Sequence, residues 1–205
     1  MDKTILFIDG ENFRYKVEEV LEAEKVHKDA VDFASINLQQ LVLTVFAGQR
    51  IAKKFFYAAR MRQHKETMEK SKELIQAQRR LKNNLERQGF TYIQAGNVRA
   101  QTVRVGKETE LVFREKGVDV KLAVDMVSMA ADKQMNKAII CSSDSDLQPA
   151  IAALQKNKVR VVYLGFQLNP NKGLMYTADE VVLFRNQEII EASKQNKTSK
   201  SSTQV

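Results

Sequence analysis

The sequence predicts an α/β protein whose central sheet is mainly parallel and is covered by helices on both faces. Short apolar runs such as 4–8 and 137–141 alternate with longer stretches whose apolar residues recur at helical spacing, as in 118–131. Strands that alternate with helices form βαβ units, and these units build parallel sheets. Ligands of such sheets bind beyond the carboxyl ends of the strands, so polar residues that directly follow a strand are the first candidates for function.

The first part of the chain contains two predicted strands and two predicted helices. Residues 4–8 are apolar on both faces, as expected for a buried strand, and a polar turn at 9–12 leads into a helix over 13–23. Residues 36–46 carry apolar side chains at helical spacing and are followed by a glycine, which is a suitable helix stop. Residues 50–59 are predicted as the second strand.

The middle of the chain contains a long predicted helix, a strand and a hairpin. The stretch 63–88 is highly charged but has one stripe of apolar residues, which is typical of an amphipathic helix. This stripe can pack on the domain itself or on a second copy of the chain, so a homodimer is one option. Residues 90–94 are predicted as the third strand, and 98–105 with 109–114 are predicted to pair as a hairpin around Gly106.

The last part of the chain repeats the alternation of helices and strands. Helices are predicted over 118–131 and 147–156, and a proline in the first turn of the second helix is tolerated there. Strands are predicted over 137–141, 159–164 and, as a short final strand, 181–184.

Length and composition limit the classes of protein that the chain can belong to. With 205 residues and ordinary apolar content, it suits one domain, predicted over 1–190, followed by a lysine- and serine-rich tail, 191–205, that is expected to be disordered. Cys141 is the single cysteine, which excludes an intrachain disulfide and fits a cytoplasmic location. No apolar run is long enough to cross a bilayer, so a membrane is not an expected partner.

The charge balance points to a polyanionic partner. The chain has 33 lysine and arginine residues against 25 aspartate and glutamate residues, a formal net charge of +8. The predicted domain remains basic without the lysine-rich tail. An excess of this size favours nucleic acid as the partner.

Four aspartates lie where predicted strands end or predicted helices begin. Asp9 follows the first strand, Asp144 and Asp146 follow the fourth, and Asp119 lies in the first turn of the helix after the hairpin. Taken singly, each of them suits a helix N-cap, because a carboxylate there accepts backbone N–H groups and complements the helix dipole.

Together, the four acids are expected to share one edge of the sheet. Two carboxylates ~4 Å apart at an effective dielectric constant of ~20 repel by roughly 4 kcal/mol, so a bound cation or a raised pKa must relieve them. Oxygen ligands without histidine or cysteine select hard ions such as Mg²⁺ or Mn²⁺, and such sites support metal-assisted phosphoryl transfer. The sequence therefore predicts that these four aspartates bind the metal and carry the catalysis.

Five polar residues near the acids are candidates for substrate binding. They are Asn12, Arg60, Arg62, Lys121 and Ser143. The asparagine and the serine can contact a phosphate or orient a water, and the three cations can neutralise phosphate oxygens. The alternative for each is structural: a turn-forming side chain or a solvated surface cation. Asp125 is six residues beyond Asp119, so it points elsewhere on the helix and suits a structural role, while the role of Glu11 stays open.

Three segments hold most of these candidates: FIDGENF (7–13), KGVDVKLA (116–123) and SSDSDLQP (142–149). In order and spacing they resemble the NYN domain family, of the LabA-like branch, within the PIN-like nucleases. The similarity spans about residues 3–165. Family members often have a glycine at the position of Ser143, and the serine can narrow the approach of a phosphate.

The resemblance implies a PIN-like three-layer α/β/α sandwich and ribonuclease chemistry that depends on Mg²⁺ or Mn²⁺. The four aspartates would hold the metal, Asn12 would accompany Asp9, and Ser143 would contact phosphate. RNA is the implied partner. The leading hypothesis is therefore a metal-dependent endoribonuclease.

Two rival hypotheses stay open at this point. The same fold can serve as an RNA- or protein-binding regulatory module with weak or no catalysis. A phosphatase or phosphotransferase on a different α/β fold is the other rival, although Asp9 is not followed by a second aspartate two residues on and no P-loop pattern is present.

Overall fold

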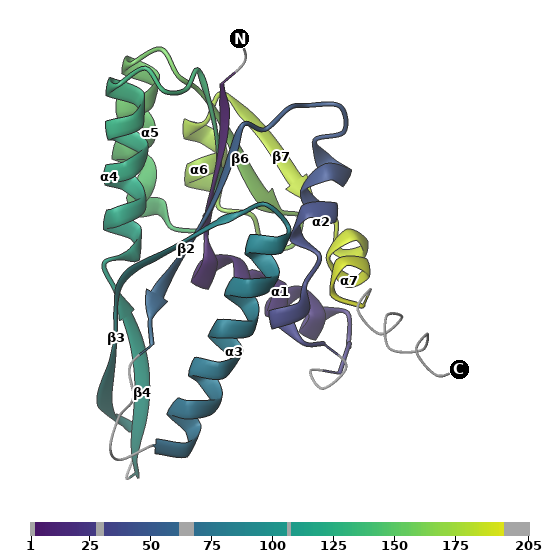
Figure 1. The fold of residues 1–205 in the computed structure, drawn as a ribbon, viewed down its shortest axis with the longest axis vertical. Coiled ribbons are helices and arrows are strands. Elements are labelled where there is room, and N and C mark those ends of the chain that lie inside the picture. The colour runs from purple at the N-terminus through teal and green to yellow at the C-terminus, as the bar shows by residue number, and fades with distance from the viewer. Residues whose placement is uncertain (1–2, 28–30, 62–67, 106–107, 195–205) are drawn as a thin grey trace.

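The computed structural model describes residues 3–27, 31–61, 68–105 and 108–194 (Figure 1). Within these residues, seven strands form one sheet in the order β4-β3-β2-β1-β5-β6-β7. Six of them run parallel, and β4 is antiparallel to β3 at one edge. The strands are β1 (Thr4–Asp9), β2 (Lys53–Arg60), β3 (Thr91–Val105), β4 (Glu108–Lys116), β5 (Lys137–Cys141), β6 (Arg160–Phe166) and β7 (Glu180–Phe184). The predicted α/β class with a mainly parallel sheet is thereby confirmed.

Helices cover both faces of the sheet and complete three layers (Figure 1). One face packs against α1 (Gly10–Ala23), α2 (Leu38–Val45), α7 (Asn186–Lys194) and part of α3 (Met68–Arg87). The other face packs against α4 (Val118–Ala131), α5 (Gln148–Lys156) and α6 (Lys172–Thr177). Short 3₁₀ turns lie at Phe33–Ser35 and Ser145–Leu147.

The central strand β1 is buried along its whole length because both its faces meet helices. Leu6 and Ile8 belong to the core under α1, whereas Ile5 and Phe7 belong to the core under α4 and α5. By the same alternation, Asp9 extends the row of Ile5 and Phe7. Its carboxylate therefore lies at the end of the sheet face that α4 covers.

Strand β3 is continuous and contains a bulge. The sequence instead predicts two separate strands here, one at 90–94 and one at 98–105 as an arm of the hairpin. Ala58 pairs with Gln94 but Arg60 pairs with Asn97, so β3 has one more residue than β2 over this step. Gly96 occupies this step with φ of 66°. The glycine allows the strand to continue through the bulge.

Gly96 also allows the end of β4 to approach β3 closely. A Cβ atom at this position would collide with the carbonyl oxygen of Lys116 and would lie 3.2 Å from the carbonyl carbon of Gly117. Gly117, with φ of 87°, is the N-cap of α4. The two glycines therefore set where α4 begins and with it the position of Asp119.

The C-terminal part of the chain contains two helices that the sequence analysis missed. Asn171 caps α6 by accepting a hydrogen bond from the backbone N–H of Leu174 at 2.9 Å, but six residues are too few to show a helical period. Helix α7 continues to Lys194, past the domain boundary predicted at residue 190. The remainder of the predicted tail, 195–205, lies outside the described residues, as does the start of the helix predicted over 63–88.

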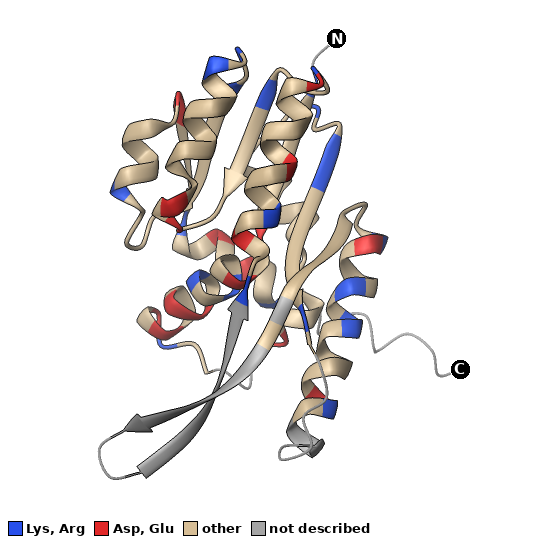
Figure 2. Cartoon of the chain, turned by 90° about the vertical axis from the view of Figure 1, so that its left-hand side faces the viewer, with Lys and Arg blue, Asp and Glu red and all other residues tan. Residues whose placement is uncertain are grey.

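The charged helices carry local ion pairs on their outer sides, and acidic and basic residues are intermixed along α1 and α3 (Figure 2). On α1, Arg14 pairs with Glu11 and Glu18; on α3, Lys82 pairs with Glu86. The apolar stripe of α3 packs at least partly on the domain itself, because Leu85 is buried in the core under α1.

Two further features bear on the predicted location and partners. Cys141 is buried, and burial raises the pKa of its thiol, as expected for an unreactive core cysteine. Among the helices of the described residues, none has the length and apolar character needed to cross a membrane.

Candidate functional site

The candidate site lies where the strand order of the sheet reverses. From the central β1 the chain proceeds to β2 and β3 on one side, while β5, β6 and β7 extend on the other side. The sheet edge at the carboxyl ends of β1 and β5 is thus the switch point, where open α/β sheets bind their ligands. Asp9 is the last residue of β1, and Ser142 to Asp144 directly follow β5.

Asp9 is a buried carboxylate that caps α1. It is 3% exposed, and its Oδ1 accepts a hydrogen bond from the backbone N–H of Asn12 at 3.1 Å. Its Oδ2 accepts one from Nδ2 of Asn12 at 2.7 Å and one from Oγ of Ser142 at 3.3 Å. Gly10 is needed directly after it, because a Cβ there would lie 2.5 Å from the carbonyl oxygen of Tyr57.

The surroundings of Asp9 are electrostatically unbalanced. Burial raises the pKa of the Asp9 carboxyl above its ordinary value, and the negative charge of Asp144 adds to the rise. The hydrogen bonds from Asn12 and Ser142 act in the opposite direction. In the described part of the chain no lysine, arginine or histidine forms an ion pair with Asp9. Among the described residues, the site therefore places two acidic side chains near each other with no cationic side chain paired to Asp9.

Asp144 lies beside Asp9 and is connected to it through Ser142. The backbone N–H of Asp144 donates to Oγ of Ser142 at 3.1 Å, and that hydroxyl donates to Asp9. Oδ1 of Asp144 accepts from the backbone N–H of Asp146 at 2.9 Å and caps the 3₁₀ turn. Both acids therefore act as N-caps, as the structural alternative predicts. Capping does not explain why the two carboxylates lie near each other.

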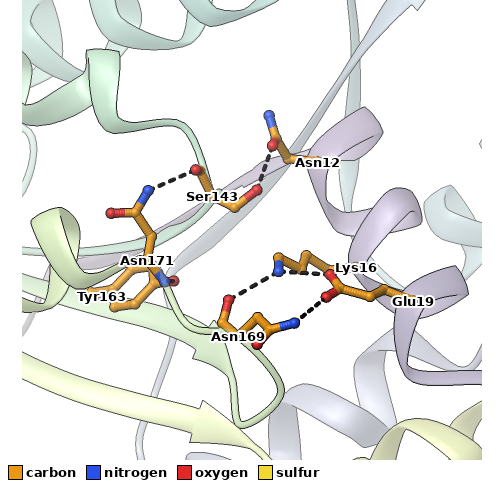
Figure 3. Close-up of polar contacts among 7 residues, drawn as sticks. All are labelled: Asn12, Lys16, Glu19, Ser143, Tyr163, Asn169 and Asn171. Carbon is orange, nitrogen blue, oxygen red and sulfur yellow. Dashed lines mark hydrogen bonds and ion pairs between the residues drawn. The ribbon is translucent and has the colours of Figure 1, made fainter. Parts of the chain in front are cut away.

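A chain of hydrogen bonds fixes the orientation of Asn12 and Ser143 (Figure 3). Oγ of Ser143 donates to Oδ1 of Asn12 at 2.6 Å, while Nδ2 of Asn12 points to Asp9. Nδ2 of Asn171 donates to the carbonyl oxygen of Ser143 at 2.8 Å, and the backbone N–H of Asn171 donates to Oη of Tyr163 at 3.1 Å. Asn12, which was predicted to contact substrate, thus holds the Asp9 carboxylate, and Ser143 holds Asn12 in turn.

The loop between β6 and α6 is a wall of the site that sequence reasoning missed. Lys16 Nζ on α1 donates to the carbonyl oxygen of Asn169 at 2.9 Å and to Glu19 at 2.7 Å, and Nδ2 of Asn169 donates to Glu19 at 2.6 Å (Figure 3). These contacts bind the loop to α1. The available signal was a pair of asparagines beyond the end of a predicted strand, at the same sheet edge as Asp9.

Asp119 lies in the first turn of α4, on the helix face of the core residues Leu122 and Met126. Its carboxylate is half-buried and accepts no hydrogen bond from the other described residues. Lys121 instead forms an ion pair with Asp125 at 2.6 Å. Asp125 also accepts a hydrogen bond from Oη of Tyr57 at 3.1 Å, which ties α4 to β2.

The other predicted residues lie further out. Asp146 is exposed in the 3₁₀ turn, and Arg60 is exposed at the end of β2, on the predicted edge of the sheet. Arg62 lies outside the described residues. The structure therefore brings Asp9 and Asp144 together. It does not gather all four predicted acids into one cluster, because no group of three or more His, Cys, Asp or Glu side chains within the described ranges is arranged to hold a metal ion.

The residues at the switch point fit a hard divalent cation in their chemistry. The possible metal ligands around Asp9 are carboxylate, amide and hydroxyl oxygens, which Mg²⁺ and Mn²⁺ prefer. A cation would also offset the burial of Asp9 and its repulsion from Asp144.

Comparison with known proteins places the chain in a family. The model of the NYN domain matches residues 3–185. Among solved structures, the chain is similar to a protein of unknown function from Vibrio parahaemolyticus, with a TM-score of 0.55 and 19% identity over 89% of this chain and 92% of that one. At this identity the likeness concerns the fold alone. No curated protein matches the chain.

Proposed function

Because this chain belongs to the NYN domain family, whose fold is that of the PIN-like nucleases, we propose that it is a metal-dependent endoribonuclease. The observation that carries the proposal is the buried carboxylate of Asp9, held beside Asp144 at the switch point, where no lysine, arginine or histidine of the described residues pairs with it. The three sequence motifs support its assignment to the LabA-like branch.

Asp9 and Asp144 are the residues that would hold Mg²⁺ or Mn²⁺, with Asp119 and Asp146 completing the site from α4 and the 3₁₀ turn. When bound, such an ion polarises a phosphodiester and lowers the pKa of water at the site. Binding of the ion would also favour the ionised form of Asp9, because a nearby positive charge lowers the pKa that burial raises.

The side chains around the acids bind and orient. Asn12 and Ser142 hold both oxygens of Asp9, so the carboxylate needs little rearrangement when the ion binds. Arg60 at the exposed end of β2 would bind a backbone phosphate of the RNA, and the net charge of +8 would attract the strand. Both contributions make RNA binding salt-sensitive.

Replacing Asp144 with asparagine tests the proposal. Asp144→Asn keeps the oxygen that caps the 3₁₀ turn but removes one negative charge from the site, so we expect Mn²⁺-dependent cleavage of single-stranded RNA to fall at least about a hundredfold. RNA affinity should stay equal or rise, because repulsion of phosphate decreases. The control is Asp132→Asn, the same change at the C-cap of α4. Equal cleavage rates for Asp144→Asn and the parent would contradict the proposal.

Asn171 is expected to act as a positioning residue. Asn171→Asp keeps the oxygen that caps α6 but loses the N–H group that binds Ser143, whereas Asn171→Ala loses both. We expect kcat for RNA cleavage to fall about tenfold in both variants with little change in KM. Only the alanine variant should also lose about 1 kcal/mol of stability, from the missing cap. A loss of kcat that merely follows the loss of stability would reduce Asn171 to a structural role.

A second function is favoured because the four predicted acids do not form one cluster among the described residues. A regulatory module that binds RNA or protein with little or no turnover needs no complete carboxylate cluster, and the described residues contain no group of three potential metal ligands. Purified protein that binds RNA in a salt-sensitive manner, yet leaves it intact with and without Mn²⁺, would establish this function in place of the first.

A further inference from the structure

A cavity of about 410 Å³ opens between α1, α3 and the 3₁₀ turn Phe33–Ser35, over β2 and β3. Its volume is within the range of small-ligand sites. Gly10 and Glu11, the two residues that follow Asp9, line it. The cavity therefore adjoins the candidate metal site and lies on the other side of the N-terminus of α1.

The walls of the cavity suit a flat apolar group. Phe56 and Tyr92 form part of the wall over the sheet, with ring centroids 5.8 Å apart and an interplanar angle of 16°. Phe33 closes one side. Ala58 and Ala77 line the cavity with short side chains, which leave room between the rings and α3.

The rim of the cavity is polar and excludes a phosphate as the main ligand. Arg14 lies between Glu11 at 2.7 Å and Glu18 at 3.2 Å, and Asp32 contributes a further acid, so carboxylates outnumber the arginine in the lining. Such a rim offers several hydrogen-bond acceptors and one guanidinium donor. These are the groups that bind the amino and carbonyl edges of a base.

We propose that this cavity binds a nucleobase of the RNA strand whose phosphate lies at Asp9, a role that rests on the proposed function. The ring system would stack within the aromatic walls, and its edge would meet Glu11, Arg14 and Glu18 at the rim. Because acceptors dominate there, bases with an amino group, such as guanine, bind more tightly than uracil, which has none.

Fluorescence titration with mononucleotides tests the proposal without RNA cleavage. The chain has no tryptophan, so Phe33→Trp places a single reporter in the cavity wall. Guanosine 5′-monophosphate should change its emission saturably, uridine 5′-monophosphate should bind more weakly, and ribose 5-phosphate should have no effect. An equal response to ribose 5-phosphate would overturn the proposal, as would no response to any of the three.

A matched pair on α3 locates the binding. In the same background, Ala77→Phe fills the cavity and should weaken guanosine 5′-monophosphate binding about tenfold, the scale of one lost base stack. Gln76→Phe adds the same ring at the neighbouring exposed position and should leave binding unchanged. If circular dichroism shows that Ala77→Phe does not fold, Ala77→Leu takes its place. Equal affinities in the filled and control variants would contradict the assignment.

The titration separates this inference from the nuclease proposal, because it requires neither metal nor turnover. A protein that binds guanosine 5′-monophosphate in the cavity but leaves RNA intact would contradict the nuclease proposal alone. A protein that cleaves RNA but gives no response in the titration would contradict the base-binding site alone.

Discussion

Asp9→Asn is expected to abolish Mn²⁺-dependent RNA cleavage and, with it, the stabilisation that Mn²⁺ gives to the folded protein. The parent places a buried carboxylate beside Asp144, and an ion that binds the folded state alone stabilises it by about 2.7 kcal/mol at one hundred times its Kd. The variant lacks the charge that attracts the ion. Thermal unfolding with increasing Mn²⁺ should therefore raise the Tm of the parent and not that of Asp9→Asn.

The variant is expected to fold, so the loss can be assigned to the site. The new amide keeps an oxygen for the backbone N–H of Asn12, and the amide of Asn12 can turn to accept from its NH₂ group. RNA binding at low salt should persist in the variant because Arg60 and the other surface cations are unchanged. A variant that still cleaves RNA at the parent's rate would show that Asp9 is not part of the catalytic site.

The same substitution gives a pH signature in the metal-free protein. Burial raises the pKa of Asp9 in the folded state, so the folded protein binds this proton more tightly than the unfolded chain. Its contribution to stability is full below the ordinary aspartate pKa, about 3.9, and is lost as pH rises through the higher folded pKa. The difference in the free energy of unfolding between parent and Asp9→Asn should change over this pH window and become constant above it. Saturating Mn²⁺ should restore the stability of the parent at neutral pH.

Gly96→Ala is expected to be the most destabilising single substitution among those considered, and to lower activity as well. A Cβ atom there meets the carbonyl oxygen of Lys116, and the φ of 66° disfavours any residue with a side chain. The left-handed backbone costs roughly 1–2 kcal/mol and the overpacking about 1–3 kcal/mol more. Relief of the collision would shift the start of α4 and displace Asp119.

Gly48→Ala is the matched control, because Gly48 has a φ of 76° but nothing within 4 Å of an added Cβ. It should lose about 1–2 kcal/mol and keep full activity. Urea unfolding and RNA cleavage measured on both variants separate the backbone cost from the collision. Equal stability losses and equal activities in the two would show that the contact between β3 and β4 does not set the position of α4.

Most of the fold was predictable because most of its elements carry their own signal, the exceptions being α6 and α7. The strands next to the switch point, β1 and β5, are runs of apolar residues buried on both faces, and α4 was predicted with the bounds that the structure has. The bulge at Gly96 was not predictable in the same way, because a glycine favours both a turn and a bulge. Only its pairing with β2 and the close approach of β4 decide between them.

The centre of the candidate site could also be predicted from the sequence, because Asp9 and Asp144 follow strands that the architecture brings together. The orientation of their neighbours could not. Ser143 and Asn12 hydrogen-bond to each other, which depends on side-chain rotation, and Asn171 reaches Ser143 from a loop 28 residues further on. Lys121 forms an ion pair with Asp125, one helical turn away. Sequence spacing alone does not show whether Lys121 binds this carboxylate or a phosphate of the substrate.

The most direct test of the central claim is anomalous diffraction from crystals soaked in Mn²⁺. We expect a manganese peak at the carboxyl ends of β1 and β5, within coordination distance of the carboxylates of both Asp9 and Asp144, and no such peak in Asp9→Asn crystals. A fully occupied ion elsewhere on the molecule, with these two carboxylates unchanged at a concentration that supports cleavage, would contradict it.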